Sequence, residues 1–248
     1  MRSATLGMSQ RIARARQELR GGGTAPVAGL LPGRIMGFDR LAPFYRRLEW
    51  VLAGGKLQTC RLRHIHALKD CQRVLLAGEG HGRFLTELVR RYPLMNITYA
   101  DQSPGMLKAA KTALASAGLA YDRVTFQQAD LVHAVLSVGV YDAIVTHFFL
   151  DCFSPQELSM VVANLSHSAN DRAVWLLSDF CEAQEGWRHL RSRLILKLMY
   201  WFFRRATKLS ASYLTDPMQY LPLEGFRLHN RVEFEWGLMY SCLLHREP

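Results

Sequence analysis

Val74-Leu75-Leu76-Ala77-Gly78-Glu79-Gly80-His81-Gly82 is the stretch of sequence that decides the fold. Four apolar residues predict a buried strand, and the glycines after them predict a tight turn before a helix. Such a turn lets the backbone approach a ligand closely, and the helix N-terminus offers free N–H groups. A dinucleotide site of the Gly-x-Gly-x-x-Gly type would need a glycine where Arg83 stands, which disfavours NAD or FAD. A glycine-rich turn without a ligand is the structural alternative.

The pattern on either side of this turn indicates a parallel sheet wrapped by helices, because short apolar runs alternate with helical stretches. It predicts strands over 73–77, 96–100, 123–128, 141–146 and 172–179, and helices over 82–92, 104–117, 155–168 and 185–208. A strand starting at Gly225-Phe226 and another over 234–244 have only a short link, which is typical of an antiparallel hairpin. We therefore expect a Rossmann-like α/β fold with a seven-stranded, mostly parallel sheet and an antiparallel last strand.

The positive charge is concentrated in the N-terminal part of the chain. The 248 residues carry a formal net charge of +10, and residues 1–66 contain 12 Lys/Arg against 3 Asp/Glu. We interpret residues 1–36 as a basic flexible arm and linker, and residues 37–248 as one domain with a helical cap over 37–68. The arm could meet phosphates, anionic lipid or an acidic partner, or it could be a solvated tail.

The cysteine pattern argues against a metal site and against disulfides. The five cysteines are widely spaced, without a Cys-x-x-Cys or Cys/His cluster, so we expect no metal and a reducing, cytoplasmic setting. The longest apolar run, residues 194–203, is interrupted by Lys197 and is about half the ~20 residues that a membrane span requires. The sequence therefore predicts no transmembrane segment.

Two further strands are predicted to end in a carboxylate. Asp101 lies 23 residues beyond Gly78, where it can accept hydrogen bonds from both hydroxyls of a ribose. Gln102 follows it, and Met106, in the first turn of the next helix, could pack on an adenine face. The third strand leads to Asp130-Leu131, where Asp130 is placed to accept from an adenine amino group. An aspartate that caps its own surface loop is the alternative for Asp130.

Together these residues resemble the class I S-adenosylmethionine-dependent methyltransferases, in particular the ubiquinone/menaquinone-biosynthesis-like group that acts on small molecules. The resemblance covers about residues 37–246 and implies S-adenosylmethionine as the cofactor. The residues it implies for cofactor binding lie in the glycine turn and at the ends of three strands: Ala77, Gly78, Glu79, Gly80, Gly82, Asp101, Gln102, Met106, Asp130, Leu131 and His147.

One position departs from this family, which often has an acid two residues before the first glycine. Here that residue is Leu76. Contacts to the amino group of the cofactor would then be rearranged, and Glu79 is a candidate substitute. A solvated loop residue is the other interpretation of Glu79.

The fourth strand delivers His147-Phe148-Phe149-Leu150-Asp151 to the edge where open α/β sheets bind ligands. His147 is the candidate general base, with Asp151 as a second catalytic candidate, because an imidazole near its ordinary pKa accepts a proton from a hydroxyl or amine. A histidine that only packs locally is an equal alternative. Methyl transfer depends mainly on in-line approach, so no base need exist.

The acceptor pocket is expected beside these residues. Asp179 and Phe180 end the fifth strand, and Phe148 follows the fourth, while Tyr45 and Tyr200 are candidates from the covering helices. Residues 194–203 leave little polar face and have arginines on both sides, which burial in the core explains most simply. The alternatives are an apolar lid over the acceptor and peripheral contact with a membrane surface.

These observations predict an enzyme that transfers a methyl group from S-adenosylmethionine to a small, apolar or aromatic acceptor. One competitor is an RNA methyltransferase guided by the basic arm. Nucleic-acid partners are disfavoured, because the fourth strand lacks the Asn/Asp-Pro-Pro-Tyr element usual in methyltransferases that modify nucleic-acid amino groups. Another competitor is a non-catalytic partner subunit that binds the cofactor. The sequence does not indicate an oligomeric state.

Overall fold

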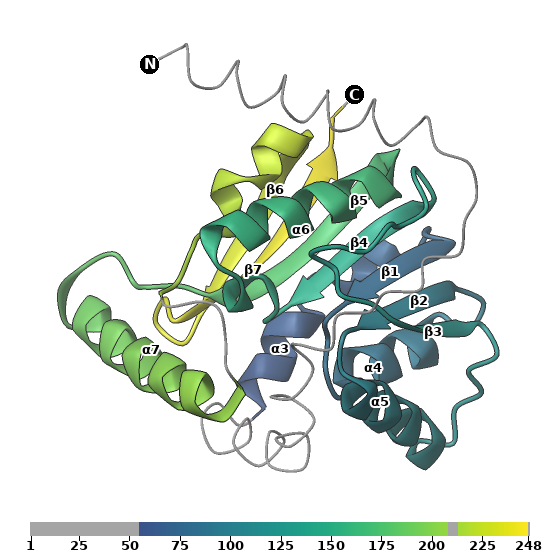
Figure 1. Ribbon diagram of the computed structural model, residues 1–248, viewed down its shortest axis with the longest axis horizontal. Coiled ribbons are helices and arrows are strands. Elements are labelled where there is room, and N and C mark those ends of the chain that lie inside the picture. Colours follow the sequence, from purple (N-terminus) through teal and green to yellow (C-terminus); the bar gives the residue numbers. More distant parts are fainter. Residues whose placement is uncertain (1–54, 208–212, 248) are drawn as a thin grey trace. The chain divides into compact units, whose positions relative to one another are not determined.

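The computed structural model describes residues 55–207 and 213–247, with the side chains of 202–207 excepted, and shows one seven-stranded sheet (Figure 1). The strands are ordered β3-β2-β1-β4-β5-β7-β6. Their bounds are β1 Arg73–Ala77, β2 Asn96–Asp101, β3 Val124–Gln128, β4 Tyr141–His147, β5 Ala169–Phe180, β6 Phe226–Phe234 and β7 Met239–Arg246. The first five strands run parallel, and β7 pairs antiparallel with both β5 and β6. The predicted fold class is confirmed.

The helices are α3 Lys56–Leu62, α4 Arg83–Arg91, α5 Pro104–Ser116, α6 Pro155–Ser168 and α7 Gly186–Thr207. Short 3-10 turns are η1 Ile65–Leu68, η2 Leu150–Cys152, η3 Pro217–Gln219 and η4 Leu221–Glu224. None of the helices in the described ranges is long and apolar enough to cross a membrane. Of the predicted cap over 37–68, α3 and η1 are described, and residues 37–54 lie outside the described ranges, as does the arm over 1–36.

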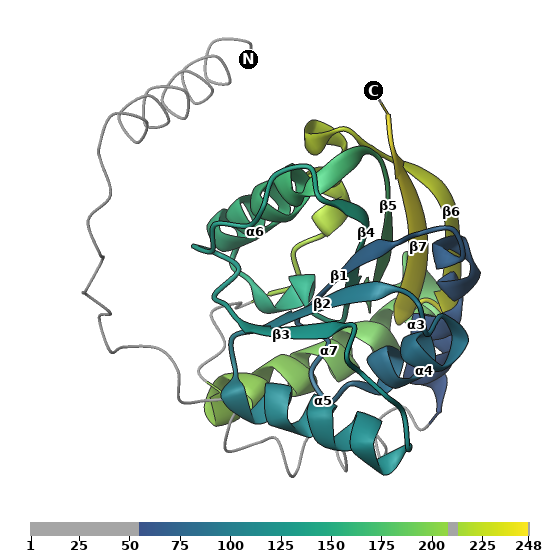
Figure 2. The same cartoon turned by 90° about the vertical axis from the view of Figure 1, so that its right-hand side faces the viewer.

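Alternation along the parallel strands divides the core into two layers. Leu75 and Ala77 face α6, whereas Val74 and Leu76 face α4 and α5. Figures 1 and 2 show α6 on one side of the sheet and α3, α4 and α5 on the other. Because both faces are covered, β1 has four buried residues in succession.

A third apolar cluster joins α7 to the sheet. Leu196 and Tyr200 of α7 pack with Leu57 and Cys60 of α3 and with Met239 of β7. This cluster also contains Phe148, which follows β4. The buried side of α7 therefore lies beside the carboxyl end of β4, where the sequence predicts the site.

Capping residues fix where α5 and α6 begin. The Ser103 hydroxyl accepts a hydrogen bond from the Met106 N–H at 3.1 Å, with Pro104 in the first turn. Ser154 and Glu157 form a capping box at the start of α6. Both helices start within a few residues of a predicted site residue, so these caps help to position the site.

The prediction for the hairpin was right in topology and wrong in one boundary. Phe234, taken as the start of the last strand, ends β6 instead. A turn with positive φ at Glu235, Trp236 and Gly237 separates it from Met239, where β7 begins. The alternation of aromatic and acidic residues in Phe234-Glu235-Trp236 is typical of a strand, and only Gly237 pointed to the turn.

Candidate functional site

Three glycines shape the turn after β1, and each has a positive φ: 64° at Gly78, 80° at Gly80 and 75° at Gly82. A Cβ at Gly78 would lie 1.9 Å from the Phe149 ring, and one at Gly82 would lie 2.8 Å from the Ala110 Cα of α5. At Gly80 the nearest atom would be the Met106 Sδ, at 3.9 Å. Two glycines therefore allow close packing, whereas a Cβ at Gly80 would make only one ordinary van der Waals contact, which leaves room for a ligand to approach the backbone.

Glu79 holds this turn against the helix that follows it. Its Oε1 accepts a hydrogen bond from the Phe84 N–H at 2.9 Å, although the side chain is buried. One of the N-terminal N–H groups of α4 is thus satisfied by a carboxylate, which also complements the helix dipole. The structure gives Glu79 a capping role, which differs from the solvated loop residue considered from the sequence.

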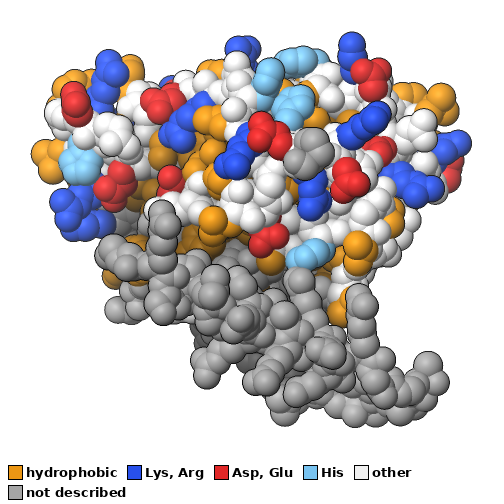
Figure 3. Space-filling view, turned by 90° about the horizontal axis from the view of Figure 1, so that it is seen from above, with side chains coloured by type: hydrophobic (Ala, Val, Ile, Leu, Met, Phe, Trp, Pro, Cys, Tyr) orange, Lys and Arg blue, Asp and Glu red, His pale blue; other side chains and the backbone are white. Residues whose placement is uncertain are grey.

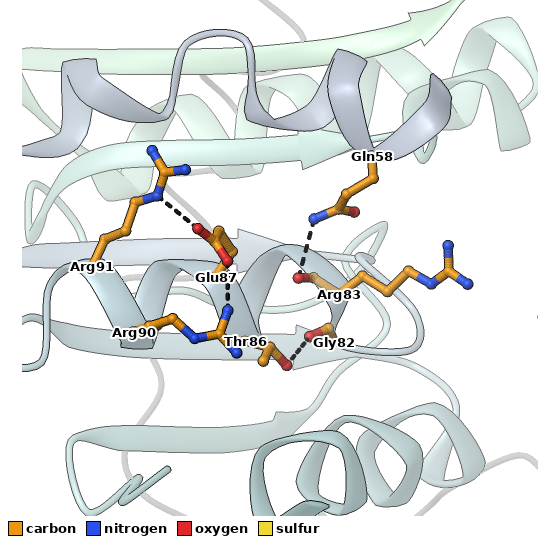
Figure 4. A network of polar contacts seen from close by, with 7 residues as sticks. All are labelled: Gln58, Gly82, Arg83, Thr86, Glu87, Arg90 and Arg91. Carbon is orange, nitrogen blue, oxygen red and sulfur yellow. Dashed lines mark hydrogen bonds and ion pairs between the residues drawn. The ribbon is translucent and has the colours of Figure 1, made fainter. Parts of the chain in front are cut away.

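Helix α3 contacts the same helix from above (Figure 4). The Gln58 Nε2 donates to the Arg83 carbonyl oxygen at 3.3 Å. One turn further on, the Glu87 carboxylate accepts from both Arg90 and Arg91. The N-terminus of α4 faces the turn. The helix is held by the hydrogen bond from α3 and is further stabilised by the ion pairs of Glu87 within α4.

Asp101 ends β2 beside the turn and is nearly buried. Its Oδ1 accepts from the Ser103 N–H at 2.9 Å, which fixes the carboxylate at the sheet edge. On the same strand, the Tyr99 hydroxyl donates to the Gly80 carbonyl oxygen at 2.7 Å. Gly80, Asp101 and Met106 therefore surround one region at the carboxyl ends of β1 and β2, and this region fits an adenosine-type cofactor in its donor and acceptor chemistry. Gln102 is exposed directly after Asp101.

Asp130 lies two residues after the end of β3 and is exposed. Its Oδ1 accepts from the Val132 N–H at 3.1 Å, so the side chain caps its own loop. Leu131 is buried in the core beneath it. The sequence left both interpretations of Asp130 open, and this geometry agrees with the capping role.

His147 ends β4 on the face of the sheet that carries α4. Its side chain is 2% exposed, and its ring meets the Phe84 ring edge-on with centroids 4.5 Å apart. The Nδ1 atom is buried without a hydrogen-bond partner among the described residues. Burial, followed by the charges of Arg61 and His64, lowers the pKa of His147 well below its ordinary value. The imidazole is therefore neutral and packed, as in the alternative that the sequence left open.

Asp151 and Asp179 form a buried carboxyl pair between β4 and β5. Asp151 is 5% exposed and Asp179 is fully buried. The Asp179 carboxylate accepts from the backbone N–H of Asp151 at 3.1 Å and of Phe180 at 2.9 Å. Burial raises the pKa of Asp151 to about 6. Burial and the charge of Asp151 raise the pKa of Asp179 well above its ordinary value. Two carboxyl groups this close share a proton near neutral pH.

Aromatic side chains adjoin this pair. The Tyr200 hydroxyl donates to the Asp151 carbonyl oxygen at 3.2 Å, and the Phe148 and Phe180 rings lie 4.9 Å apart. Phe148 has a φ of 53°, a strained value for a bulky residue. The structure brings together Asp151, a catalytic candidate from the sequence, and four residues proposed there for the acceptor pocket: Phe148, Asp179, Phe180 and Tyr200. Tyr45 lies outside the described residues.

Sequence reasoning missed Phe149, whose ring packs over Gly78, and Tyr99, which binds the Gly80 carbonyl. The signal for Tyr99 was its position two residues before Asp101, on the same face of the strand. It also missed a cavity of about 910 Å³ at the ends of β5, β6 and β7, bordered by Phe180, Glu182, Arg231 and Trp236 among others. This cavity does not include the glycine turn.

A family model described as "Methyltransferase domain" matches residues 74–171, which run from β1 into β5. Three solved structures illustrate the similarity of the fold. The mitomycin 7-O-methyltransferase MmcR has a TM-score of 0.63 at 14% identity, covering 85% of this chain and 61% of its own. The S-adenosylmethionine-dependent methyltransferase SibL, in its apo form, has a TM-score of 0.62 at 20% identity, covering 95% and 69%. The fold is that of the S-adenosylmethionine-dependent methyltransferases.

The third structure is 1,6-didemethyltoxoflavin-N1-methyltransferase from Burkholderia thailandensis, with its substrate and S-adenosylhomocysteine bound. Its TM-score is 0.58 at 16% identity, covering 90% of this chain and 95% of its own. The chain spans only 61% of the length of MmcR. It spans 58% of an O-methyltransferase family protein from Burkholderia thailandensis. No curated protein sequence matches this chain.

Proposed function

We propose that this chain is an S-adenosylmethionine-dependent methyltransferase that acts on a small, apolar or aromatic acceptor. The observation that carries the proposal is the room beside Gly80, where a Cβ would meet only the Met106 Sδ, next to the carboxylate of Asp101 at the sheet edge. S-adenosylmethionine, when bound, supplies an electrophilic methyl group on a sulfonium. The sequence pattern favours the ubiquinone/menaquinone-biosynthesis-like group within this fold and a cytoplasmic setting.

In this proposal the residues of the turn and the neighbouring strand hold the cofactor. Asp101 accepts hydrogen bonds from the ribose hydroxyls, and Met106 packs on the adenine. Gly78, Gly80 and Gly82, with Ala77 before them, give the backbone its close approach. Gln102, Asp130 and Leu131 border the adenine end. Glu79 acts indirectly, because its hydrogen bond to Phe84 keeps the turn in shape.

The Asp151/Asp179 pair is the proposed proton acceptor. An acceptor hydroxyl, amine or thiol loses a proton when it is methylated, so a group with a pKa near 6 is matched to neutral pH. Tyr200 orients this pair through the Asp151 backbone. We assign His147 no base role, because its ring packs on Phe84 on the α4 face of the sheet.

The acceptor is proposed to be apolar or aromatic because Phe148, Phe180 and Tyr200 surround the pair. Structures with the same fold support this choice. They include a mitomycin 7-O-methyltransferase, a 1,6-didemethyltoxoflavin-N1-methyltransferase and an O-methyltransferase family 2 protein in complex with apigenin, and all three compounds are small molecules. The aromatic side chains would orient a flat acceptor by stacking, while the carboxyl pair takes its proton.

Calorimetry of the full chain with S-adenosylmethionine, S-adenosylhomocysteine and NAD tests the cofactor assignment. We expect micromolar binding of the first two and none of NAD. Preference for NAD, or no binding of either adenosyl compound by folded protein, would overturn the proposal. Binding without turnover of any flat phenol, amine or thiol offered would instead indicate a non-catalytic partner subunit.

The basic N-terminal residues favour RNA as a second candidate acceptor, since residues 1–20 contain five arginines and one acid. On the described surface in Figure 3, cationic, anionic and histidine side chains are interspersed. RNA binding that weakens steeply with salt and is lost on deletion of residues 1–20 would support this candidate.

A further inference from the structure

Helix α7 has an exposed apolar stripe on the side that does not pack on the domain. Trp187, Leu190, Leu194 and Leu198 are 60%, 71%, 64% and 67% exposed. Their spacing of three, four and four residues places them on one face. The opposite face, with Ser192, Leu196 and Tyr200, is buried against the domain. Core packing therefore does not explain the stripe.

The charges of this helix are all of one sign. Residues 186–207 contain six Lys/Arg and no Asp/Glu. At about 100° per residue, Arg193 and Lys197 fall along one side of the stripe and Arg188 and Arg191 along the other. Arg188, Arg193 and Lys197 are exposed. An apolar stripe with cations on both sides results.

The turn between β6 and β7 extends the stripe. The Trp236 ring is 55% exposed and lies 5.9 Å from the Trp187 ring, centroid to centroid. Arg191 lies over the same Trp236 ring at 5.0 Å and donates to the Glu235 carbonyl oxygen at 3.3 Å. Trp236 has a φ of 54°, an outlier for so bulky a residue. The backbone is thus strained where it presents this indole beside α7.

We propose that this surface, made of the α7 stripe and Trp236, docks on a bilayer that contains anionic phospholipid. Leucines at the centre suit the acyl boundary, and tryptophans suit the headgroup level. Arginines and a lysine on both sides suit anionic phosphates. A second copy of the chain fits poorly, because a twofold pairing of α7 would bring six cations against six. The charge on the helix is thus what selects lipid over self-association.

The geometry also places the bilayer near the proposed acceptor site. Tyr200, on the buried face of α7, donates to the Asp151 backbone, so the stripe and the carboxyl pair lie on opposite sides of this one helix. An apolar acceptor dissolved in the bilayer would then have a short route to the pair. This last step rests on the proposed function, whereas lipid docking does not.

The test is co-sedimentation of the full chain with phosphatidylcholine vesicles, with and without phosphatidylglycerol. We expect binding to the anionic vesicles, weakened by salt, and a blue shift of tryptophan fluorescence. The double variant Leu190→Gln/Leu194→Gln should lower the partition coefficient roughly tenfold or more. Leu94→Gln/Leu223→Gln is the matched control, since both residues are exposed leucines away from α7. Residues 1–20 are the same in every variant, so a difference belongs to the stripe.

Three results would overturn the proposal: no vesicle binding by the unaltered chain, equal binding of the stripe variant, or equal binding to neutral vesicles. Loss of a concentration-dependent dimer in the stripe variant, without vesicle binding, would indicate a second copy as the occupant. Cofactor affinity measured on the same variants separates this test from the proposed function. We expect it to be unchanged, because no stripe residue borders Gly80.

Discussion

Asp101 ends β2 and Asp130 follows β3 by two residues, at the same sheet edge, yet their surroundings differ. Asp101 is nearly buried beside the turn, whereas Asp130 is exposed and caps its own loop. We expect Asp101→Ala to weaken cofactor binding by about 1–3 kcal/mol, because the ribose hydroxyls lose a charged acceptor. Asp130→Ala, the matched control, should cost less. Calorimetry on both variants decides, and an equal effect would place the ribose elsewhere.

We expect the Asp151/Asp179 pair to lower the stability of the folded protein at neutral pH while it supports activity. Each carboxyl has a folded pKa above its ordinary value, so the folded state binds more protons and loses stability as pH rises through about 4 to 6. Asp151→Asn removes this loss, with a gain of up to about 3 kcal/mol at neutral pH. Activity should fall ~10²–10⁴-fold if the pair takes the proton. Thermal unfolding and turnover at neutral pH measure both effects.

A matched change at Cys152 controls this prediction. The Cys152 thiol donates to the Asp151 Oδ1 at 3.5 Å without carrying the shared proton. Cys152→Ser keeps a donor at that place, so its stability and rate should stay close to those of the unaltered chain. Equal loss of activity in both variants, or no stabilisation by Asp151→Asn, would contradict the role of the pair.

The sequence predicted that His147 and Asp151 lie at the carboxyl end of β4, but it did not predict which face of the sheet His147 occupies or that Asp151 meets Asp179. His147, as the last residue of β4, was expected in the crevice, and alternation along the strand instead turns it toward Phe84. Asp151 reaches Asp179 only because η2 bends the chain after Phe149. Such a short turn leaves no periodic signal, so spacing alone could not pair the two carboxyls.

The close contact between the glycine turn and α5 predicts that Gly82 does not tolerate a side chain. Gly82→Ala would force a φ of 75° on alanine and bring its Cβ to 2.8 Å from Ala110. Gly118→Ala carries the same backbone strain, with a φ of 64°, but has open space. We expect a loss of about 1 kcal/mol at Gly118 and about 1–3 kcal/mol more at Gly82. Denaturant unfolding measures both, and equal losses would contradict the close packing.

Gly80→Ala distinguishes an effect on cofactor binding from an effect on packing at the same turn. Its Cβ would meet only the Met106 Sδ at 3.9 Å, so stability should fall no more than in Gly118→Ala. Cofactor binding should fall at least tenfold, because the methyl group would lie where we propose that the cofactor approaches the backbone. Unfolding and calorimetry on one sample compare the two effects. Full affinity in a folded Gly80→Ala protein would mean that the cofactor does not approach here.

The elements were more predictable than the contacts between them. The observed bounds of β1 to β4 agree with the predicted ones to within one residue, and the clearest signals were Gly78 directly after β1 and Asp101 at the end of β2. β5 begins at Ala169, before the predicted 172, because Ala169 pairs with Tyr141 across an irregularity in the register. Pairing across strands, which no local pattern encodes, also decided that β6 continues to Phe234.

At the scale of the whole molecule, two sets of buried groups respond to pH in opposite directions. Burial lowers the folded pKa of His64 and His147, so the folded state binds fewer protons than the unfolded chain, and stability falls as pH drops below about 6.5. The Asp151/Asp179 pair gains stability over much of the same acidic range. The unaltered chain should therefore show a shallow dependence of its free energy of unfolding between about pH 4 and 6.5.

Two variants should separate the pH dependence of stability that comes from the histidines from the dependence that comes from the carboxyl pair. His147→Phe keeps a ring against Phe84 and removes one group that resists protonation, so this protein should gain stability relative to the unaltered chain as pH falls. Asp151→Asn should lose stability more steeply on acidification, because the histidines then act without the carboxyl pair. Each slope changes by up to about 1.4 kcal/mol per pH unit, which denaturant unfolding at several pH values resolves. Parallel curves for all three proteins would mean that these groups titrate alike in the folded and unfolded states, and the carboxyl pair could then not be the proton acceptor held near neutral pH.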